Sequence, residues 1–131
     1  KVFSKEGQIE YIKSFENDKT KFLYGIFYNN IHIGNIEINP INYKLKHGTI
    51  SMMIGEKEFW GKGIATYAFN YISKIAKNQF KLKRLYSSCA GENIASFTAL
   101  KKAGFVLVSS VKDYFFYDEK YMSLLNLSKE L

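Results

Sequence analysis

A strand pattern meets a helix pattern at Glu58-Phe59-Trp60-Gly61-Lys62-Gly63-Ile64-Ala65. The apolar run Thr49–Ile54 before this segment is typical of a β-strand. After it, apolar residues recur at helical spacing from Ile64 to about Lys77. A strand that turns through two glycines into a helix directs several backbone N–H groups, and the positive end of the helix dipole, at one point. The segment therefore predicts an anion site, usually for a phosphate or pyrophosphate.

The glycine spacing narrows the kind of phosphate site. Gly61 and Gly63 leave room for a ligand to approach the backbone, and Lys62 adds a positive charge. A P-loop has wider glycine spacing and ends in Gly-Lys-Ser/Thr, and a dinucleotide fingerprint would need a third glycine where Thr66 stands. On these residues alone, an ordinary strand-to-helix connection is an equally good interpretation.

A second segment, Glu92–Phe105, makes the pattern specific. It contains Asn-x-x-Ser, from Asn93 to Ser96, and Lys-x-Gly-Phe, from Lys102 to Phe105. Together with Trp-Gly-Lys-Gly and the following Ala-Thr, these motifs stand in the order and spacing of the GNAT acetyltransferases. The chain resembles that family over roughly residues 22–127, most closely the branch of ribosomal-protein N-terminal acetyltransferases and amino-sugar acetyltransferases. The resemblance implies a mixed α+β fold, with a central, mostly antiparallel twisted sheet flanked by helices.

The composition suits one small domain. The chain has 131 residues, and apolar residues make up 47%, which is enough for one core. No run of about 18 uncharged apolar residues occurs, and the first residues do not resemble a signal peptide, so we expect no membrane contact. A single cysteine, Cys89, excludes an internal disulfide and fits a reducing compartment. We therefore expect a cytoplasmic protein.

The net charge of +7 comes almost wholly from lysine, and Arg84 is the only arginine. It reflects either lysine-rich codon usage or attraction to an acidic molecule such as coenzyme A. Nucleic-acid-binding proteins more often use arginine forks and basic clusters. Nucleic-acid binding, which would be strongly salt-dependent, is therefore the least favoured interpretation.

Periodicity and turn residues predict the remaining elements. The order is α-β-β-β-α-β-α-β-β, whereas the family begins with one further strand and helix. We therefore expect a single GNAT domain over residues 1–131 that is truncated at its N-terminus, and an unpaired strand edge that favours a homodimer. In the first half we expect a helix at Ser4–Asn17, a strand at Lys21–Tyr28, an Asn29-Asn30 turn, and a strand at Ile31–Ile38 with a bulge at Gly34. A break at Asn39–Asn42 is expected before the strand His47–Ile54 and the helix from Ile64. The expected remainder is a strand at Arg84–Cys89, a helix at Asn93–Lys102 closed by Gly104, and a final strand pair at Phe105–Phe116 and Tyr121–Leu127.

The resemblance implies direct acetyl transfer from acetyl-CoA to a primary amine in a ternary complex, with no metal. It implies that a main-chain N–H of Met53 or Ile54 contacts the thioester carbonyl and that Asn93 contacts the pantetheine arm. Asn93 is also well suited to cap a helix, and both roles are compatible. Glu58 stands where the family usually has Gln or Arg, which backbone contacts would tolerate. The cofactor's pyrophosphate is expected on the loop of Trp60, Gly61, Lys62, Gly63, Ile64 and Ala65.

The catalytic residues follow less directly from the pattern. Many relatives have a tyrosine where Leu100 stands, whereas the branch that this chain resembles has a serine, matched by Ser96. Ser96 would contact the cofactor and return a proton to the departing thiolate; simple helix-start polarity is the alternative. Glu37 is our choice of general base among carboxylates that are mostly expected to be solvated, and no base is needed if the amine arrives neutral.

Two questions stay open at this level. The acceptor is either a small molecule such as an amino sugar or a protein N-terminus, with the small molecule slightly favoured by the positive charge. Aromatic residues between Tyr114 and Tyr121 would border the acceptor cleft, although most are expected to be packing residues. The alternative to an enzyme is a catalytically silent CoA-binding sensor or scaffold module, which would bind acetyl-CoA without turnover.

Overall fold

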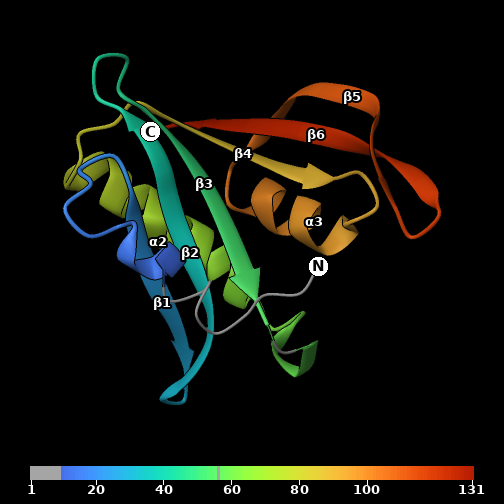
Figure 1. The fold of residues 1–131 in the computed structure, drawn as a ribbon, viewed down its shortest axis with the longest axis horizontal. Coiled ribbons are helices and arrows are strands. Elements are labelled where there is room, and N and C mark those ends of the chain that lie inside the picture. The colour runs from blue at the N-terminus through green and yellow to red at the C-terminus, as the bar shows by residue number, and fades with distance from the viewer. Residues whose placement is uncertain (1–9, 56) are drawn as a thin grey trace.

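The computed structural model describes residues 10–55 and 57–131, and its strands form one six-stranded sheet in the order β1-β2-β3-β4-β6-β5 (Figure 1). All neighbouring strands are antiparallel except β3 and β4, which are parallel. The mixed α+β class and the order of the elements are confirmed. The elements are β1 (Phe22–Tyr28), β2 (Ile31–Asn42), β3 (His47–Ile54), the short 3-10 helix η1 (Lys57–Phe59), α2 (Ile64–Asn78), β4 (Arg84–Ala90), α3 (Ile94–Lys102), β5 (Val106–Tyr117) and β6 (Lys120–Glu130).

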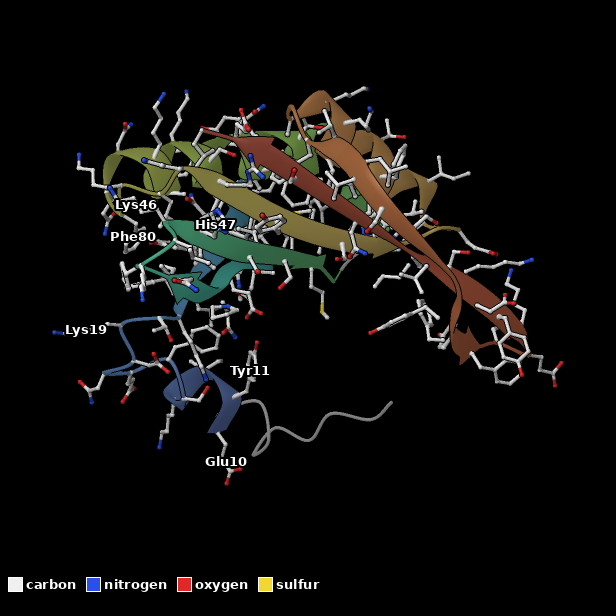
Figure 2. All side chains as sticks on the ribbon, turned by 90° about the horizontal axis from the view of Figure 1, so that it is seen from above. Glu10, Tyr11, Lys19, Lys46, His47 and Phe80 are labelled. Carbon is white, nitrogen blue, oxygen red and sulfur yellow. The ribbon has the colours of Figure 1, made fainter. Side chains whose placement is uncertain are left out.

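The helices α2 and α3 lie on one face of the sheet, and the helical residues 10–13 lie on the other (Figure 2). Residues 4–9 of the expected first helix lie outside the described residues, and residues 14–17 form a turn instead of continuing the helix. The core forms between α2 and the sheet, where Phe69 and Ile72 pack with Ile38, Ile50 and Leu85. No helix in the described part of the chain is both long and apolar enough to cross a membrane.

The β1–β2 hairpin follows the expected turn chemistry. Asn29 and Asn30 both have positive φ, 49° and 65°, which matches the right-handed twist of the flanking strands. The expected bulge is present one residue from its predicted place, because the register skips Ile33 beside Gly34. A Cβ on Gly34 would collide with the backbone of Met53, so glycine is needed for β2 to pair closely with β3.

The predicted break at Asn39–Asn42 is wrong, because β2 continues through Asn42. Pro40 has no N–H to give to a ladder, and the register shift between Ile38 and Ile41 leaves Asn39 and Pro40 without partners in β3. Ile41 then returns to the ladder opposite Gly48 and is buried in the core. The proline is thus accommodated in a bulge, and the burial of Ile41 stabilises the pairing of β2 with β3 beyond it.

The C-terminal elements confirm the role of Gly104. Gly104 has a φ of 94°, a left-handed conformation that terminates α3. Its N–H donates to the carbonyl of Lys101, and the N–H of Phe105 donates to the carbonyl of Leu100. This pair of bonds, with Leu100 and Phe105 both buried, is a Schellman closure. Strands β5 and β6 then pair antiparallel as expected; β5 lies one residue later than predicted, and β6 extends beyond its predicted bounds at both ends.

Candidate active site

The parallel strands β3 and β4 separate along their length. They pair only from His47 opposite Arg84 to Thr49 opposite Tyr86, although both strands continue well beyond these residues. At the point of separation, the buried Ser87 hydroxyl donates to the carbonyl of Ile50 at 3.0 Å. This bond satisfies a carbonyl that strand pairing no longer reaches, and beyond it a wedge-shaped gap opens in the sheet.

The register decides which backbone groups face this gap. The Ile50 carbonyl points toward β4, and the pairing with β2 runs without a shift from Ile50 to Ile54. Because backbone groups alternate between the two neighbouring strands, the N–H groups of Met52 and Ile54 face the gap. The N–H of Met53 faces β2, and its side chain is 66% exposed. Of the two residues expected near the thioester carbonyl, Ile54 therefore has the suitable N–H.

The glycine loop leaves the start of α2 open. Gly61 and Gly63 have φ of 75° and 76°, which L residues adopt only with strain. Gly63 is the N-cap, no side chain caps the helix, and the first turn holds no acidic residue. A Cβ added to either glycine would meet nothing within 4 Å. The first N–H groups of α2 thus point at open space, as an anion site requires.

Helix α3 begins in the opposite way. The Oδ1 of Asn93 accepts the N–H of Ser96 at 3.1 Å, so Asn93 is the N-cap of this helix. Its Nδ2 keeps two donors that this bond does not use. The capping role is therefore confirmed, and the cofactor role remains compatible with it.

These elements enclose one open cleft of about 470 Å³ on the helix side of the gap. Of the residues expected at the site, it brings together Met53, Ile54, Trp60, Gly61, Gly63, Ala65, Asn93 and Ser96. Trp60 is fixed in place by its Nε1, which donates to the carbonyl of Ile54 at 3.1 Å. The other lining residues are Met52, Phe59, Thr66, Ala95, Thr98, Ala99 and Lys102.

Two expected loop residues do not line this cleft. The Lys62 ammonium lies 5.7 Å from the centre of the Tyr28 ring, and Lys62 and Ile64 line a separate hollow between β1 and α2. Lys102 is the lysine that lines the cleft instead, together with Thr66 in the first turn of α2. Lys102 follows Ser96 and Ala99 at three-residue steps on one face of α3, and this spacing could have revealed it.

Glu37, the expected general base, lies outside the cleft lining. Its carboxylate accepts hydrogen bonds from the hydroxyls of Tyr11, at 2.5 Å, and of Ser51, at 2.9 Å. Partial burial, and then the bond to Glu37, raises the pKa of Tyr11 to about 12, so the phenol remains a donor at neutral pH. Glu37 therefore belongs to a hydroxyl-bound cluster on the opposite face of the sheet.

The late aromatic residues, a metal site and the single cysteine were also considered as parts of the site. The aromatic side chains of the β5–β6 hairpin do not line the cleft; Tyr114, Phe116, Tyr117 and Tyr121 are exposed, which differs from the expected packing. Within residues 10–55 and 57–131, no group of three His, Cys, Asp or Glu side chains is placed to hold a metal ion. Cys89 is buried, which raises the pKa of its thiol.

Comparison with protein-family models matches residues 2–106 to the acetyltransferase (GNAT) domain. The chain belongs to the GNAT family. It is therefore an N-acetyltransferase that depends on acetyl-CoA, and the resemblance inferred from its motifs is confirmed. Comparison with curated protein sequences gives no match.

Solved structures show the same fold at low sequence identity. The ribosomal L7/L12 α-N-protein acetyltransferase RimL, in complex with coenzyme A, is 19% identical with a TM-score of 0.89, and the match covers 99% of this chain and 75% of that one. The spermidine N-acetyltransferase of Vibrio cholerae, in complex with CoA and spermine, is 21% identical with a TM-score of 0.88, covering 98% and 76%. The microcin C7 self-immunity acetyltransferase MccE, in complex with acetyl-CoA and AMP, is 21% identical with a TM-score of 0.85, covering 98% and 73%. These likenesses confirm the fold.

Proposed function

We propose that this GNAT enzyme transfers the acetyl group of acetyl-CoA directly to a small primary amine, within a ternary complex. One observation carries the proposal: the gap between β3 and β4, the uncapped start of α2 and one face of α3 all meet at the same cleft. An extended cofactor can lie along such a cleft with its phosphates at the helix start and its thioester at the gap. The proposal supplies a place for each charge that the reaction moves.

The cofactor would be held mainly by the backbone. Its pyrophosphate would accept from the N–H groups of the Gly61–Gly63 loop and the first turn of α2. Lys102, whose side chain lines the cleft, would add the positive charge that Lys62 does not bring there. The pantetheine amides would meet the N–H of Met52 and the Nδ2 of Asn93.

The chemistry then needs three events at the gap. The Ile54 N–H would donate to the thioester carbonyl while the amine nitrogen attacks its carbon. The C–N bond forms, the C–S bond breaks and the electron pair leaves with sulfur. Ser96, which lines the cleft beside Asn93, would donate its hydroxyl proton to the thiolate and take up a proton from water in exchange. The amine's proton would leave through water, since Glu37 lies outside the cleft lining.

A small acceptor is supported by the size of the site. The open cleft is of the size of ordinary small-molecule pockets, and the cofactor would take up much of it. The structural neighbours include one complex with spermine and one acetyltransferase of a ribosomal protein. Both acceptor classes carry a primary amine, so a protein N-terminus is the alternative that the acceptor screen must distinguish.

Calorimetric titration of the full chain with acetyl-CoA, free CoA and 3′-dephospho-CoA tests the cofactor site. We expect micromolar binding of acetyl-CoA, followed by thiol release when a panel of small amines is added. Failure of a folded sample to bind acetyl-CoA would overturn the proposal. Binding without thiol release on any small amine or peptide would favour a catalytically silent CoA-binding module.

A further inference from the structure

One carboxylate on this basic chain has hydroxyl partners but no cationic partner in the part of the chain that the structure describes. Glu37 is half-buried on β2, and its two oxygens accept from Tyr11 and Ser51. The salt bridges found among residues 10–55 and 57–131 do not include it. A partly buried carboxylate that is held in place and has no cationic partner among the described residues is an unusual feature of a protein with net charge +7.

The cluster lies on the face of the sheet opposite α2 and α3, where the helical residues 10–13 also lie. Glu37 is directly opposite Ser51, and Ser51 is two residues before Met53, so the three side chains share the face opposite α2 and α3. Tyr11 reaches this face from the helical residues 10–13, and Figure 2 shows its side chain directed toward the sheet. Because β3 and β4 stop pairing after Thr49 and Tyr86, the gap between them borders this face as well as the helix side.

This placement suits the second substrate of a ternary complex. The cofactor would occupy the helix side of the gap, so the acceptor must enter from another direction, and on the face of Glu37 the neighbouring residues Ser51 and Met53 are exposed. Ile54 lies three residues beyond Ser51 on β3, which is roughly 10 Å at the usual rise per residue. The Glu37 carboxylate lies beside Ser51, 2.9 Å from its hydroxyl, and its hydrogen bond to an ammonium would take up about 3 Å of that distance. The remainder suits an acceptor with about four or five methylene groups between a reacting amine and a second charge.

We propose that Glu37, held by Tyr11 and Ser51, binds the second, non-reacting ammonium group of a diamine acceptor. This inference rests on the proposed function and names the acceptor class of that site. Each carboxylate oxygen has a further lone pair that an ammonium can use, and the two hydroxyl donors keep the carboxylate oriented without neutralising it. The lysines elsewhere on the surface oppose such a ligand weakly, because charges more than about 8 Å away are largely screened at physiological salt.

The acceptor role differs from the general-base role first expected for Glu37. A base must reach the proton of the attacking nitrogen at hydrogen-bond distance, whereas Glu37 lies outside the residues that line the cleft. Tyr11 would act as a positioning residue, because it contacts the carboxylate and holds its direction.

The test compares two acceptors that differ in one amine: 1,4-diaminobutane and butylamine. For the wild-type chain we expect kcat/KM to be about 10- to 100-fold higher with the diamine, the usual worth of a charge-assisted hydrogen bond. Glu37→Gln should remove most of that preference through KM for the diamine, and leave kinetics with butylamine and KM for acetyl-CoA unchanged. Tyr11→Phe should reduce the preference by about 3-fold, a smaller effect because a neutral hydroxyl bond is weaker.

Glu10→Gln is the matched control, because Glu10 is an exposed carboxylate in the same helical residues and should not affect either acceptor (Figure 2). Thermal unfolding of each variant checks that the fold is retained. Equal loss with both amines in Glu37→Gln would overturn the inference in favour of a structural role. Absence of a diamine preference, or of any acetylation of either amine, in a wild-type chain that binds acetyl-CoA would overturn it while leaving the cofactor site intact. Failure to bind acetyl-CoA would instead overturn the proposed function, and this inference with it.

Discussion

Helices α2 and α3 both begin at the wall of the cleft, but they treat their free N–H groups differently. At α2, a left-handed glycine stands at the N-cap and no side chain accepts from the first turn. At α3, Asn93 accepts the N–H of Ser96. An N-cap glycine costs only a few tenths of a kcal/mol relative to a good capping residue, so α2 loses little stability by leaving its donors to a ligand. The two helix starts therefore present different groups to the cleft: α2 presents backbone N–H groups, and α3 presents side chains.

The largest expected effect comes from a substitution at the uncapped start of α2. Gly63→Ala forces an L residue to a φ of 76°, at a cost of about 1–2 kcal/mol, and places a methyl group where the ligand would approach. We expect acetyl-CoA affinity to fall about 100-fold by calorimetry, with a modest loss in Tm. An unchanged affinity would show that the phosphates lie elsewhere.

The next effect concerns the side chain that α3 would contribute to the chemistry. Ser96→Ala should lower kcat about 10- to 50-fold, toward the lower end of general acid catalysis, because serine is a weak acid. The KM for acetyl-CoA should change less than about 3-fold, since the cap on Asn93 uses the backbone N–H of residue 96. Unchanged turnover would remove Ser96 from the mechanism.

Substituting Lys102 and Lys62 in turn tests which of the two lysines contributes to cofactor binding. Lys102→Ala should weaken CoA binding about 10-fold, because its ammonium borders the cleft, whereas Lys62→Ala should weaken it about 2-fold or less. Titration of both variants with CoA and 3′-dephospho-CoA then shows which phosphate Lys102 contacts. Equal effects of the two substitutions would mean that Lys62 turns into the cleft when the cofactor binds.

The smallest effect separates the two roles of Asn93. Asn93→Ser keeps a capping oxygen, so the free energy of unfolding should change by no more than a few tenths of a kcal/mol, whereas Asn93→Ala should cost about 1 kcal/mol. Both variants lack Nδ2, and both should weaken acetyl-CoA binding about 3- to 5-fold. Chemical unfolding and calorimetry on the same samples provide the test. Full affinity in Asn93→Ser would leave the residue with a capping role alone.

Much of the candidate site could be predicted because its signals are local. The Gly61–Gly63 turn, the apolar periodicity of α2, the Asn93 cap and the Gly104 closure each depend on residues within about one helical turn. The local conformation that each of them produces does not depend on contacts with distant parts of the chain. These features were sufficient to recognise the family and to predict the glycine loop at the start of α2.

Predictions about side-chain direction were less successful, as three residues show. Lys62 stands at the expected place in the loop, but its ammonium lies near the Tyr28 ring. Lys102 lines the cleft, although its motif served only to indicate the family and the end of a helix. Glu37 alternates correctly along β2, yet its place outside the cleft depends on its pairing with Ser51. The direction of a side chain follows from neighbours that spacing along the chain does not identify.

By itself, the amino-acid sequence determined the family, the order of the elements from the first strand onward and the backbone conformation of the glycine loop, because turns, caps and periodicity are set by neighbouring residues. Only the tertiary structure decided where β3 separates from β4, how β2 passes Pro40, and which carboxylate is held by hydroxyl groups on the face opposite α2 and α3. Each of these depends on contacts between distant segments: Ser87 with Ile50 across 37 positions, and Tyr11 with Glu37 across 26. Such contacts form when the sheet assembles and its core is buried, and residue spacing carries no direct record of them.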